Sequence, residues 1–176
     1  MNIYTMDDKK LQIGKNPAAG EVNVLVEIPK GSSIKYQVDE ASGYMFVDRF
    51  LYTAMYFPFN YGHIPHTLAD DGDPIDAMVL CDETLIPGSV IPCQIIGMLE
   101  MEDEAGIDTK LIAVPTKKID PIYGVYTDIT DVPQALKDKM RHFYENYKTL
   151  EPKKWVKLKD WKDKATALEA VKKSIH

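Results

Sequence analysis

The sequence has little cysteine and no long hydrophobic run. Cys81 and Cys93 are the only cysteines among 176 residues, and neither has a second cysteine or a histidine at a zinc-binding spacing. A disulfide scaffold is therefore not expected, and two buried thiols are the simpler interpretation. No apolar stretch approaches the roughly 20 residues of a membrane span, and the first residues lack the pattern of a secretory signal. We expect a cytoplasmic protein without a membrane segment.

Positive charge is missing from the middle of the chain. Residues 50–109 contain no Lys or Arg and eleven Asp or Glu, whereas residues 110–176 contain fifteen Lys or Arg and nine Asp or Glu. Converging carboxylates repel one another unless cations lie between them. The pattern fits a solvated acidic face, and it fits equally a site where flanking cations and bound metal balance the charge. A net charge of −6 speaks against nucleic acid as a partner.

Alternating apolar residues predict a series of short strands. They are expected at residues 22–28, 34–38, 77–80, 90–99 and 111–114, and a turn at Gly43 predicts a hairpin between 34–38 and 44–50. In the first strand Val22, Val24, Val26 and Ile28 should share one face, with Glu27 on the other. Strands at this spacing favour a small antiparallel barrel that is closed or nearly closed.

Helical spacing replaces the alternation after about residue 130. Asp131 is a suitable N-cap for a helix that runs to about residue 149, with Pro133 in its first turn. A second helix is predicted at about 163–174, with Leu168, Val171 and Ile175 facing inward. Residues 1–176 are therefore interpreted as one α+β domain, with two helices in the C-terminal half.

The densest feature is a run of aspartates. Asp70, Asp71, Asp73 and Asp76 lie within seven residues, separated by Gly72 and Pro74. Such a loop can direct several carboxylates at a hard cation such as Mg²⁺, Mn²⁺ or Ca²⁺. A second acidic segment, residues 100–108, precedes Lys110. Two acidic loops on one barrel could build a site for several metal ions.

Other metal sites and partners fit less well. An EF-hand loop is excluded, because Ile75 or Gly72 would occupy a ligand position in the two possible registers. His63 and His66 could bind zinc, but they lie in an expected loop without a partner ligand, and loop packing is the simpler interpretation. The Lys-rich run 153–164 is interpreted as solvated surface and not as a nucleic-acid site.

The segment 71–77, Asp-Gly-Asp-Pro-Ile-Asp-Ala, closely resembles the signature of the soluble family I inorganic pyrophosphatases. Further segments resemble the family in its order: VEIPKGSSIKYQVD, FVDRF, NYG with HTLADDGDPID, DEAGIDTKLIAVP and HFYENYKTLE. The resemblance covers about residues 20–165, and the length is similar to the short bacterial type. It implies a small closed antiparallel five-stranded barrel, OB-like, with additional short strands and with helices at its side. It also implies Mg²⁺-dependent hydrolysis of pyrophosphate to two phosphates. It also implies a cytoplasmic homohexamer, with Mn²⁺ or Zn²⁺ as possible substitutes for Mg²⁺.

The resemblance also implies a role for each matching residue. The metal ligands would be Asp71, Asp76, Asp103 and Asp108, with Asp76 bridging two ions, and Asp73 would take the proton from the attacking water. The phosphates would be held by Lys35, Arg49, Tyr61, Lys110, Tyr147 and Lys148. Glu27 matches an acidic residue near the metals.

Two positions depart from the family pattern, and one other function class stays open. Gln37 stands where the family commonly has Glu, and Phe57 stands where Tyr is common, so we expect a tuned rate or metal affinity. The alternative is a divalent-metal (Ca²⁺) binding module without catalysis. Such a module would not need the phosphate-binding cations, which are Lys35, Arg49, Lys110 and Lys148. A small barrel for single-stranded nucleic acid is a third reading, which would need a basic groove and is disfavoured by the acidic middle segment.

Overall fold

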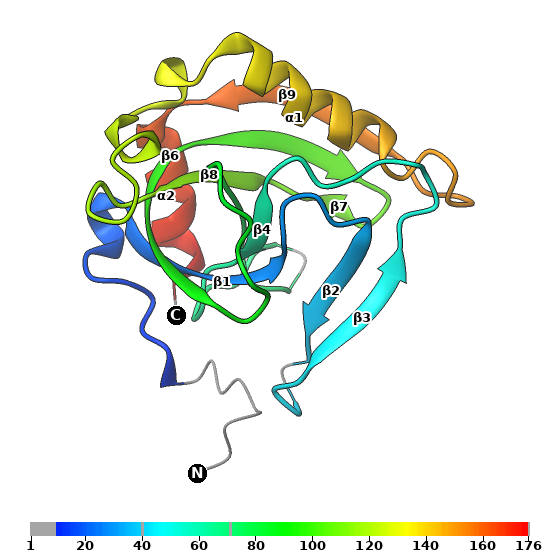
Figure 1. The fold of residues 1–176 in the computed structure, drawn as a ribbon, viewed down its shortest axis with the longest axis horizontal. Coiled ribbons are helices and arrows are strands. Elements are labelled where there is room, and N and C mark those ends of the chain that lie inside the picture. The colour runs from blue at the N-terminus through cyan, green and yellow to red at the C-terminus, as the bar shows by residue number, and fades with distance from the viewer. Residues whose placement is uncertain (1–9, 40, 71, 176) are drawn as a thin grey trace.

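Five strands form a closed ring. The computed structural model describes residues 10–39, 41–70 and 72–175. The ring follows the order β1 (Glu21–Ile28), β4 (Asn60–His63), β5 (Asp76–Val79), β8 (Lys110–Pro115) and β6 (Val90–Asp103), and β6 pairs with β1 to close it (Figure 1). The short strand β7 (Gly106–Ile107) and strand β9 (Val156–Lys162) both pair with β6. The expected five-stranded α+β architecture is confirmed.

The ring is not strictly antiparallel, which corrects the expectation. Strands β5 and β8 run parallel, with Met78 opposite Ile112, while the other ring neighbours run antiparallel. A parallel pair cannot be joined by a tight turn and needs a long crossover. Here β6 lies between β5 and β8 in the sequence and supplies that connection.

The hairpin predicted around Gly43 is present and stands apart from the ring. Strands β2 (Ile34–Val38) and β3 (Met45–Phe50) form a separate two-stranded sheet. Figure 1 shows this hairpin projecting from one side of the ring. It forms one wall of the site described below.

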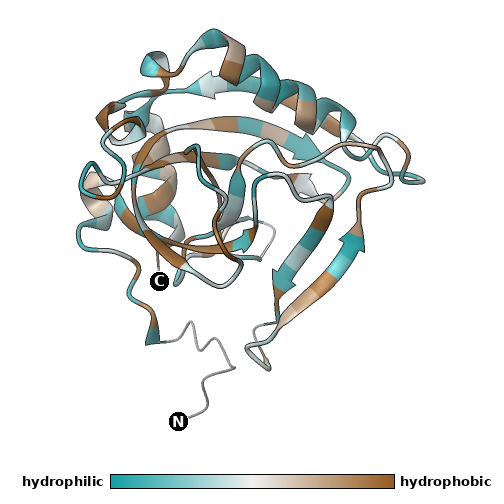
Figure 2. Cartoon of the chain, viewed as in Figure 1, coloured by the Kyte–Doolittle hydropathy of each residue, from teal (hydrophilic) through white to brown (hydrophobic). Residues whose placement is uncertain are grey.

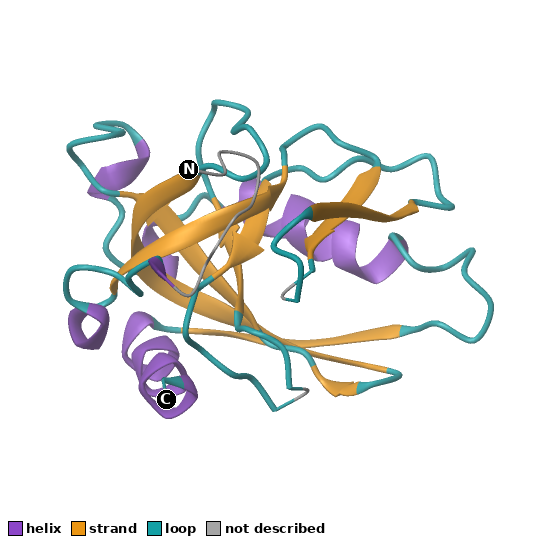
Figure 3. Ribbon diagram, turned by 90° about the horizontal axis from the view of Figure 1, so that it is seen from below, coloured by secondary structure: helices purple, strands orange, loops and turns teal. Residues whose placement is uncertain are grey.

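The core consists of two clusters on the two faces of the ring strands. Along β5 and β8, alternate residues belong to different clusters. One cluster includes Phe143 of helix α1 (Gln134–Asn146), and the other includes Val171 of helix α2 (Lys164–Ser174). Figure 2 shows hydrophobic segments along the ring strands, and Figure 3 shows the two helices on separate sides of the ring.

Strand β1 changes faces near its end. Val22, Val24 and Val26 pack in the cluster with α2, as expected for one face, but Ile28 packs in the cluster with α1. The prediction that all four share a face was therefore wrong. The reason is a shift in the register between β1 and β4 at Glu27, which changes the alternation at that point.

Helix α1 begins later than the sequence pattern predicts. Asp131 does not cap it, because Asp131 belongs to a separate 3-10 turn, η4 (Ile129–Asp131), whose own N-cap is Asp128. Val132, which precedes Pro133, is extended, since a residue before proline avoids the helical region. The α-helix therefore starts only at Gln134. Two further 3-10 turns, η2 (Pro17–Ala19) and η3 (Tyr123–Val125), lie in connecting segments.

Helix α1 also ends earlier, at Asn146. The carbonyl of Asn146 accepts hydrogen bonds from the Thr149 backbone N–H and hydroxyl, so a tight turn replaces the next helical turn. Helix α2 lies where it was predicted, with Asp163 as N-cap. Val171 is buried as expected, but Ile175 is 38% exposed, so its predicted inward position was wrong.

Two strands occupy segments expected to be irregular. Residues 60–63 form β4 where a loop was expected, and part of the Lys-rich run forms β9. Strand β6 extends to Asp103, so the second acidic segment is the end of a strand and the short β6–β7 turn. Within the described part of the chain, no helix combines the length and apolar character that crossing a membrane requires.

Candidate active site

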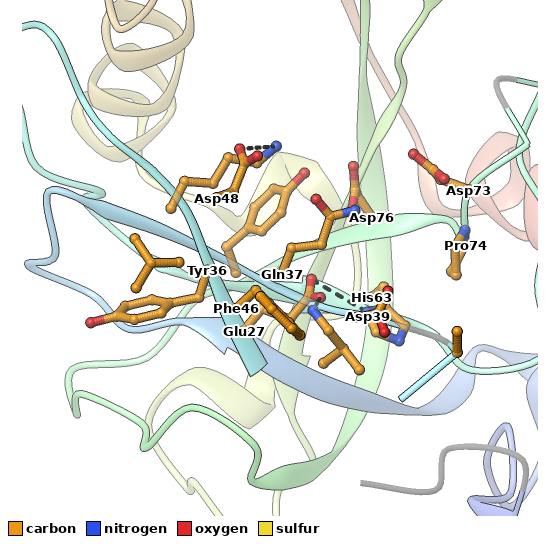
Figure 4. Close-up of a pocket in the computed structure, with 15 residues that line it drawn as sticks. Glu27, Tyr36, Gln37, Asp39, Phe46, Asp48, His63, Asp73, Pro74 and Asp76 are labelled. Carbon is orange, nitrogen blue, oxygen red and sulfur yellow. Dashed lines mark hydrogen bonds and ion pairs between the residues drawn. The ribbon is translucent and has the colours of Figure 1, made fainter. Parts of the chain in front are cut away.

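A cavity of roughly 700 Å³ lies between the hairpin and the ring. Figure 4 shows the side chains that line it, with residues of both elements directed toward a common space. Its lining residues are Glu27, Lys35, Tyr36, Gln37, Val38, Asp39, Ala41, Phe46, Val47, Asp48, Tyr61, His63, Asp73, Pro74 and Asp76. Acidic residues outnumber basic ones in this lining, so the cavity attracts cations.

The aspartate run supplies one side of the cavity. Asp73 and Asp76 both line it, and Asp76 is the first residue of β5. Gly72 has a φ of +90°, a left-handed conformation that favours glycine and turns the loop before Asp73. Asp71, the other expected ligand here, lies outside the described residues.

Lys110 lies between two of the predicted metal ligands. Its Nζ is 2.5 Å from Asp76 Oδ2 and 2.5 Å from Asp108 Oδ1. The side chain of Lys110 is almost completely buried. Burial alone would lower the pKa of its ammonium group, but Asp76 and Asp108 outweigh this and place the pKa well above its usual value. Lys110 is therefore a fixed cation that joins the two acidic segments.

Tyr61 lies beneath this cluster. The Lys110 ammonium is 5.4 Å from the centre of the Tyr61 ring, a cation–π distance. Burial, together with the negative charge of Asp76, raises the pKa of the Tyr61 hydroxyl well above its usual value. The phenol therefore stays protonated at neutral pH and can donate a hydrogen bond to an anion.

Asp103 is held by Lys148. Lys148 Nζ donates to Asp103 Oδ2 at 2.6 Å. Burial raises the pKa of the Asp103 carboxyl. The hydrogen bonds from Lys148 and from the Ala105 N–H lower it by more, so the pKa lies below its ordinary value. Tyr147 lies beside the pair, with Lys148 Nζ 5.6 Å from its ring centre. Tyr147 and Lys148 follow α1 and are not part of it, which corrects their predicted place late in the helix.

The hairpin carries its own set of ion pairs, centred on Asp48. Asp48 pairs with Lys35 at 3.3 Å and with Arg49 at 2.8 Å. The Nε of Arg49 also donates to Oε1 of the buried Glu151 at 3.2 Å. Glu151 therefore fixes the position of the Arg49 guanidinium. Lys35 lines the cavity.

The two departures from the family pattern lie at the site. Gln37 lines the cavity together with Lys35. Phe57 is buried, and its ring centre lies 5.9 Å from that of Tyr61 and 6.5 Å from that of Tyr147. Phe57 thus packs between two predicted phosphate-binding tyrosines without presenting a hydroxyl.

The donor set suits a hard divalent cation. Asp76, Asp103 and Asp108 offer carboxylate oxygens, the ligands that Mg²⁺ and Mn²⁺ prefer. As the side chains stand in residues 10–39, 41–70 and 72–175, no three His, Cys, Asp or Glu groups converge closely enough to chelate an ion. Lys110 and Lys148 hold the three carboxylates instead. His63 and His66 have different surroundings, beside Glu27 and the Leu11 carbonyl respectively, which does not favour a shared zinc site.

Several residues at the site are not marked as site residues by any pattern in the sequence. Asp48 and Glu151 were not singled out, although both bind Arg49. The place of Asp48 next to Arg49 in a predicted strand was a usable signal, whereas Glu151 lies 102 positions from Arg49 and gave none. The sequence predicts loop packing for His63, but His63 lies in a strand and lines the cavity.

Comparison with known proteins places the chain among close relatives. A family model described as inorganic pyrophosphatase matches residues 24–176. An inorganic pyrophosphatase of Aquifex pyrophilus is 54% identical over 97% of this chain and 96% of its own length. One from Saccharolobus solfataricus is 52% identical over 94% and 96% respectively. The solved structure of the Helicobacter pylori inorganic pyrophosphatase superposes with a TM-score of 0.90 at 47% identity, covering 94% of this chain and 96% of that one.

Proposed function

This chain belongs to the inorganic pyrophosphatase family and hydrolyses inorganic pyrophosphate, and we propose that the cavity between ring and hairpin is where it does so. The observation that carries this assignment is the interleaving of acids and cations: Lys110 joins Asp76 to Asp108, and Lys148 holds Asp103. A site for a metal-bound polyanion needs both kinds of charge side by side.

The substrate is held by the cations and phenols of three elements. Lys35 and Arg49 come from the hairpin, Tyr61 and Lys110 from the ring, and Tyr147 and Lys148 from the turn after α1. The guanidinium of Arg49 can offer two parallel donors to phosphate oxygens. Because the pKa of Tyr61 is raised and those of Lys110 and Lys148 lie above their usual values, all three remain donors across the neutral range.

Divalent metal, Mg²⁺ in this proposal, would be held by Asp71, Asp76, Asp103 and Asp108. When bound there, it would neutralise the charge of pyrophosphate and lower the pKa of water. The lowered pKa of Asp103 fits a ligand role, because its carboxyl is ionised at neutral pH. Mn²⁺ and Zn²⁺ remain candidate substitutes.

Asp73 is proposed as the general base. It lines the same cavity as Asp76 and lies on the loop turned by Gly72. As water attacks one phosphorus, Asp73 accepts its proton, the bridging P–O bond breaks, and the second phosphate leaves with the bond's electron pair. The developing charge is met by Lys110, Lys148 and the tyrosine hydroxyls. We further propose that the active form is a cytoplasmic homohexamer.

The competing function is a divalent-metal store without catalysis. It does not explain why cations are built into the acidic cluster, since each lysine lowers the affinity for a metal ion. The buried, doubly paired Lys110 therefore favours the enzyme.

Phosphate release from pyrophosphate tests the proposal. Activity should need Mg²⁺ and disappear when a chelator is in excess. Asp73→Asn should lower kcat by about 10²-fold or more, in the range for loss of a general base, while Mg²⁺ binding by calorimetry persists. An Asp73→Asn enzyme as fast as the wild type would remove Asp73 from the chemistry, and turnover in excess chelator would exclude the metal.

A further inference from the structure

Glu27 lies in a β-bulge. The register of β1 against β4 passes from Val26 opposite Gly62 to Ile28 opposite Tyr61, so Glu27 is an extra residue between two pairs. The strands approach closely here, since a Cβ on Gly62 would lie 2.0 Å from the Leu25 carbonyl oxygen. Bulges beside active sites commonly redirect one side chain. This one directs Glu27 into the wall of the cavity.

The two oxygens of the Glu27 carboxylate have separate partners. Oε1 accepts a hydrogen bond from the Val38 backbone N–H at 2.9 Å, and Oε2 lies 3.3 Å from Nδ1 of His63 (Figure 4). Glu27 and His63 are each only 6% exposed. A buried carboxylate is costly unless a donor or a positive charge compensates it. Nδ1 of His63, on the neighbouring strand β4, is the ring nitrogen that faces Glu27 Oε2, so a proton on this nitrogen would compensate the carboxylate.

Glu27 in turn fastens the hairpin to the ring. Val38 is the last residue of β2, and the hairpin is hydrogen-bonded as its own two-stranded sheet. At the opposite end of the hairpin, Arg49 binds the buried Glu151. Two buried carboxylates thus hold the ends of the element that carries Lys35 and Arg49, the proposed phosphate-binding residues of the hairpin. Any movement of Glu27 would shift this wall relative to the ring.

We infer that His63 is a positioning residue for pyrophosphate binding, which acts by holding the Glu27 carboxylate and through it the hairpin. This role rests on the proposed placement of the substrate in the cavity. His63 itself touches no reacting atom in the scheme. Its loss should therefore weaken substrate binding and leave the chemical step nearly unchanged.

His63→Phe tests this role, because it keeps a ring in the strand and removes both nitrogens. We expect KM for pyrophosphate to rise about fivefold while kcat stays within about twofold. His63→Asn places an amide nitrogen near the position of Nδ1 and should recover most of the lost affinity. His66→Asn is the matched control, since His66 is exposed, lies outside the cavity lining and has a φ of 57° that asparagine tolerates.

A double-mutant cycle with Glu27→Gln separates positioning from a general loss of structure. If His63 acts through Glu27, adding His63→Phe to Glu27→Gln should change KM by less than about twofold. The inference would be overturned if the effects of the two substitutions on KM simply multiplied in the double variant. It would also be overturned by an unchanged KM in His63→Phe, or by equal KM values in His63→Phe and His63→Asn. If the Phe variant does not fold, His63→Leu replaces it in the same cycle. Absence of pyrophosphatase activity in the wild type would instead refute the proposed function.

Discussion

Individual residues at this site do more than one task. Lys110 compensates Asp76 and Asp108 and is also proposed to bind phosphate. Lys148 does the same for Asp103. Each cation is therefore already placed before the substrate binds, and little ordering is left to oppose binding. Substitutions here should change charge balance and position together.

Asp76 should matter most among the described metal ligands, because it is proposed to bridge two ions. We expect Asp76→Asn to weaken Mg²⁺ binding about tenfold or more, since an amide is a poor ligand for a hard cation. Asp70→Asn is the matched control, because Asp70 is exposed and lies outside the lining of the substrate cavity. Calorimetric Mg²⁺ titration compares the two variants, and equal affinities would remove the bridging role.

Gln37 offers a test in the opposite direction. Gln37→Glu adds a negative charge to the cavity wall, and a charge a few ångströms from a divalent ion is worth on the order of 1 kcal/mol. The Mg²⁺ concentration at half-maximal activity should then fall by about fivefold. Gln134→Glu, which adds the same charge at the exposed start of α1, should leave it unchanged. If the Mg²⁺ concentration at half-maximal activity is the same in wild type and Gln37→Glu, the side chain at position 37 does not lie close to the bound metal ions.

Two aspartates that line the cavity were easier to predict from the sequence than the contacts that position the neighbouring side chains. The spacing of the aspartate run predicts that Asp73 and Asp76 come together, and both line the cavity, although Asp76 begins strand β5 instead of lying in a loop. The link between Arg49 and Glu151 had no local signature, because it joins residues far apart in the chain. The bulge at Glu27 was equally hidden, since it depends on the register between β1 and β4.

At the scale of elements, short polar connections determine where the helices begin. Asp128 caps η4 through Thr130 and also accepts a hydrogen bond at 2.9 Å from the N–H of Lys164, the first residue of α2. One side chain therefore ties together two segments that are distant in sequence. Asp131 belongs to η4, and the extended Val132 before Pro133 delays the start of α1 to Gln134.

Asp128→Ala should lower the free energy of unfolding by about 1 kcal/mol, a typical cost for a lost N-cap. Burial raises the pKa of the Asp128 carboxyl, but hydrogen bonds from Lys164 and Thr130 lower it below its ordinary value of 3.8. A lowered pKa contributes stability above that ordinary value, and the contribution is lost as the pH falls through the folded-state pKa.

Urea unfolding at several pH values measures this effect. The difference in unfolding free energy between wild type and Asp128→Ala should be largest at neutral pH and should decrease below about pH 3.8. Asp160→Ala, at an exposed position of β9, is the control and should change stability by less than about 0.5 kcal/mol. If this difference in unfolding free energy does not vary with pH, the N-cap does not depend on an ionised carboxylate.

The sequence does not predict two of the strands, β4 and β9. Strand β4 is not predicted, because Asn60 and Gly62 are poor strand formers. The pairing with β1 and β5 outweighs that preference. Strand β9 was missed because lysines dominate it, although Val156 and Leu158 keep the alternation. Pairing with the long strand β6 orders this segment.

At the scale of the whole molecule, the ring leaves apolar side chains exposed outside it. Phe50 is 64% exposed on the hairpin, and Ile122 is 66% exposed in a loop. Exposed apolar residues of this size are compatible with the proposed homohexamer. Sedimentation of the purified protein should then give about 120 kDa, six times the chain mass of 19.9 kDa. A mass near that of one chain would refute the hexamer.

Ring closure has a consequence for how this chain folds. Strands β4, β5, β6 and β8 can assemble from neighbours, but β1 must meet residues 90–94, about seventy positions further along. Closing so long a loop costs entropy before the new contacts repay it, which slows folding. Until that moment both β1 and β6 present unpaired edges that could recruit another chain. Refolding yield should therefore depend on protein concentration even though the finished ring has no open edge between these two strands.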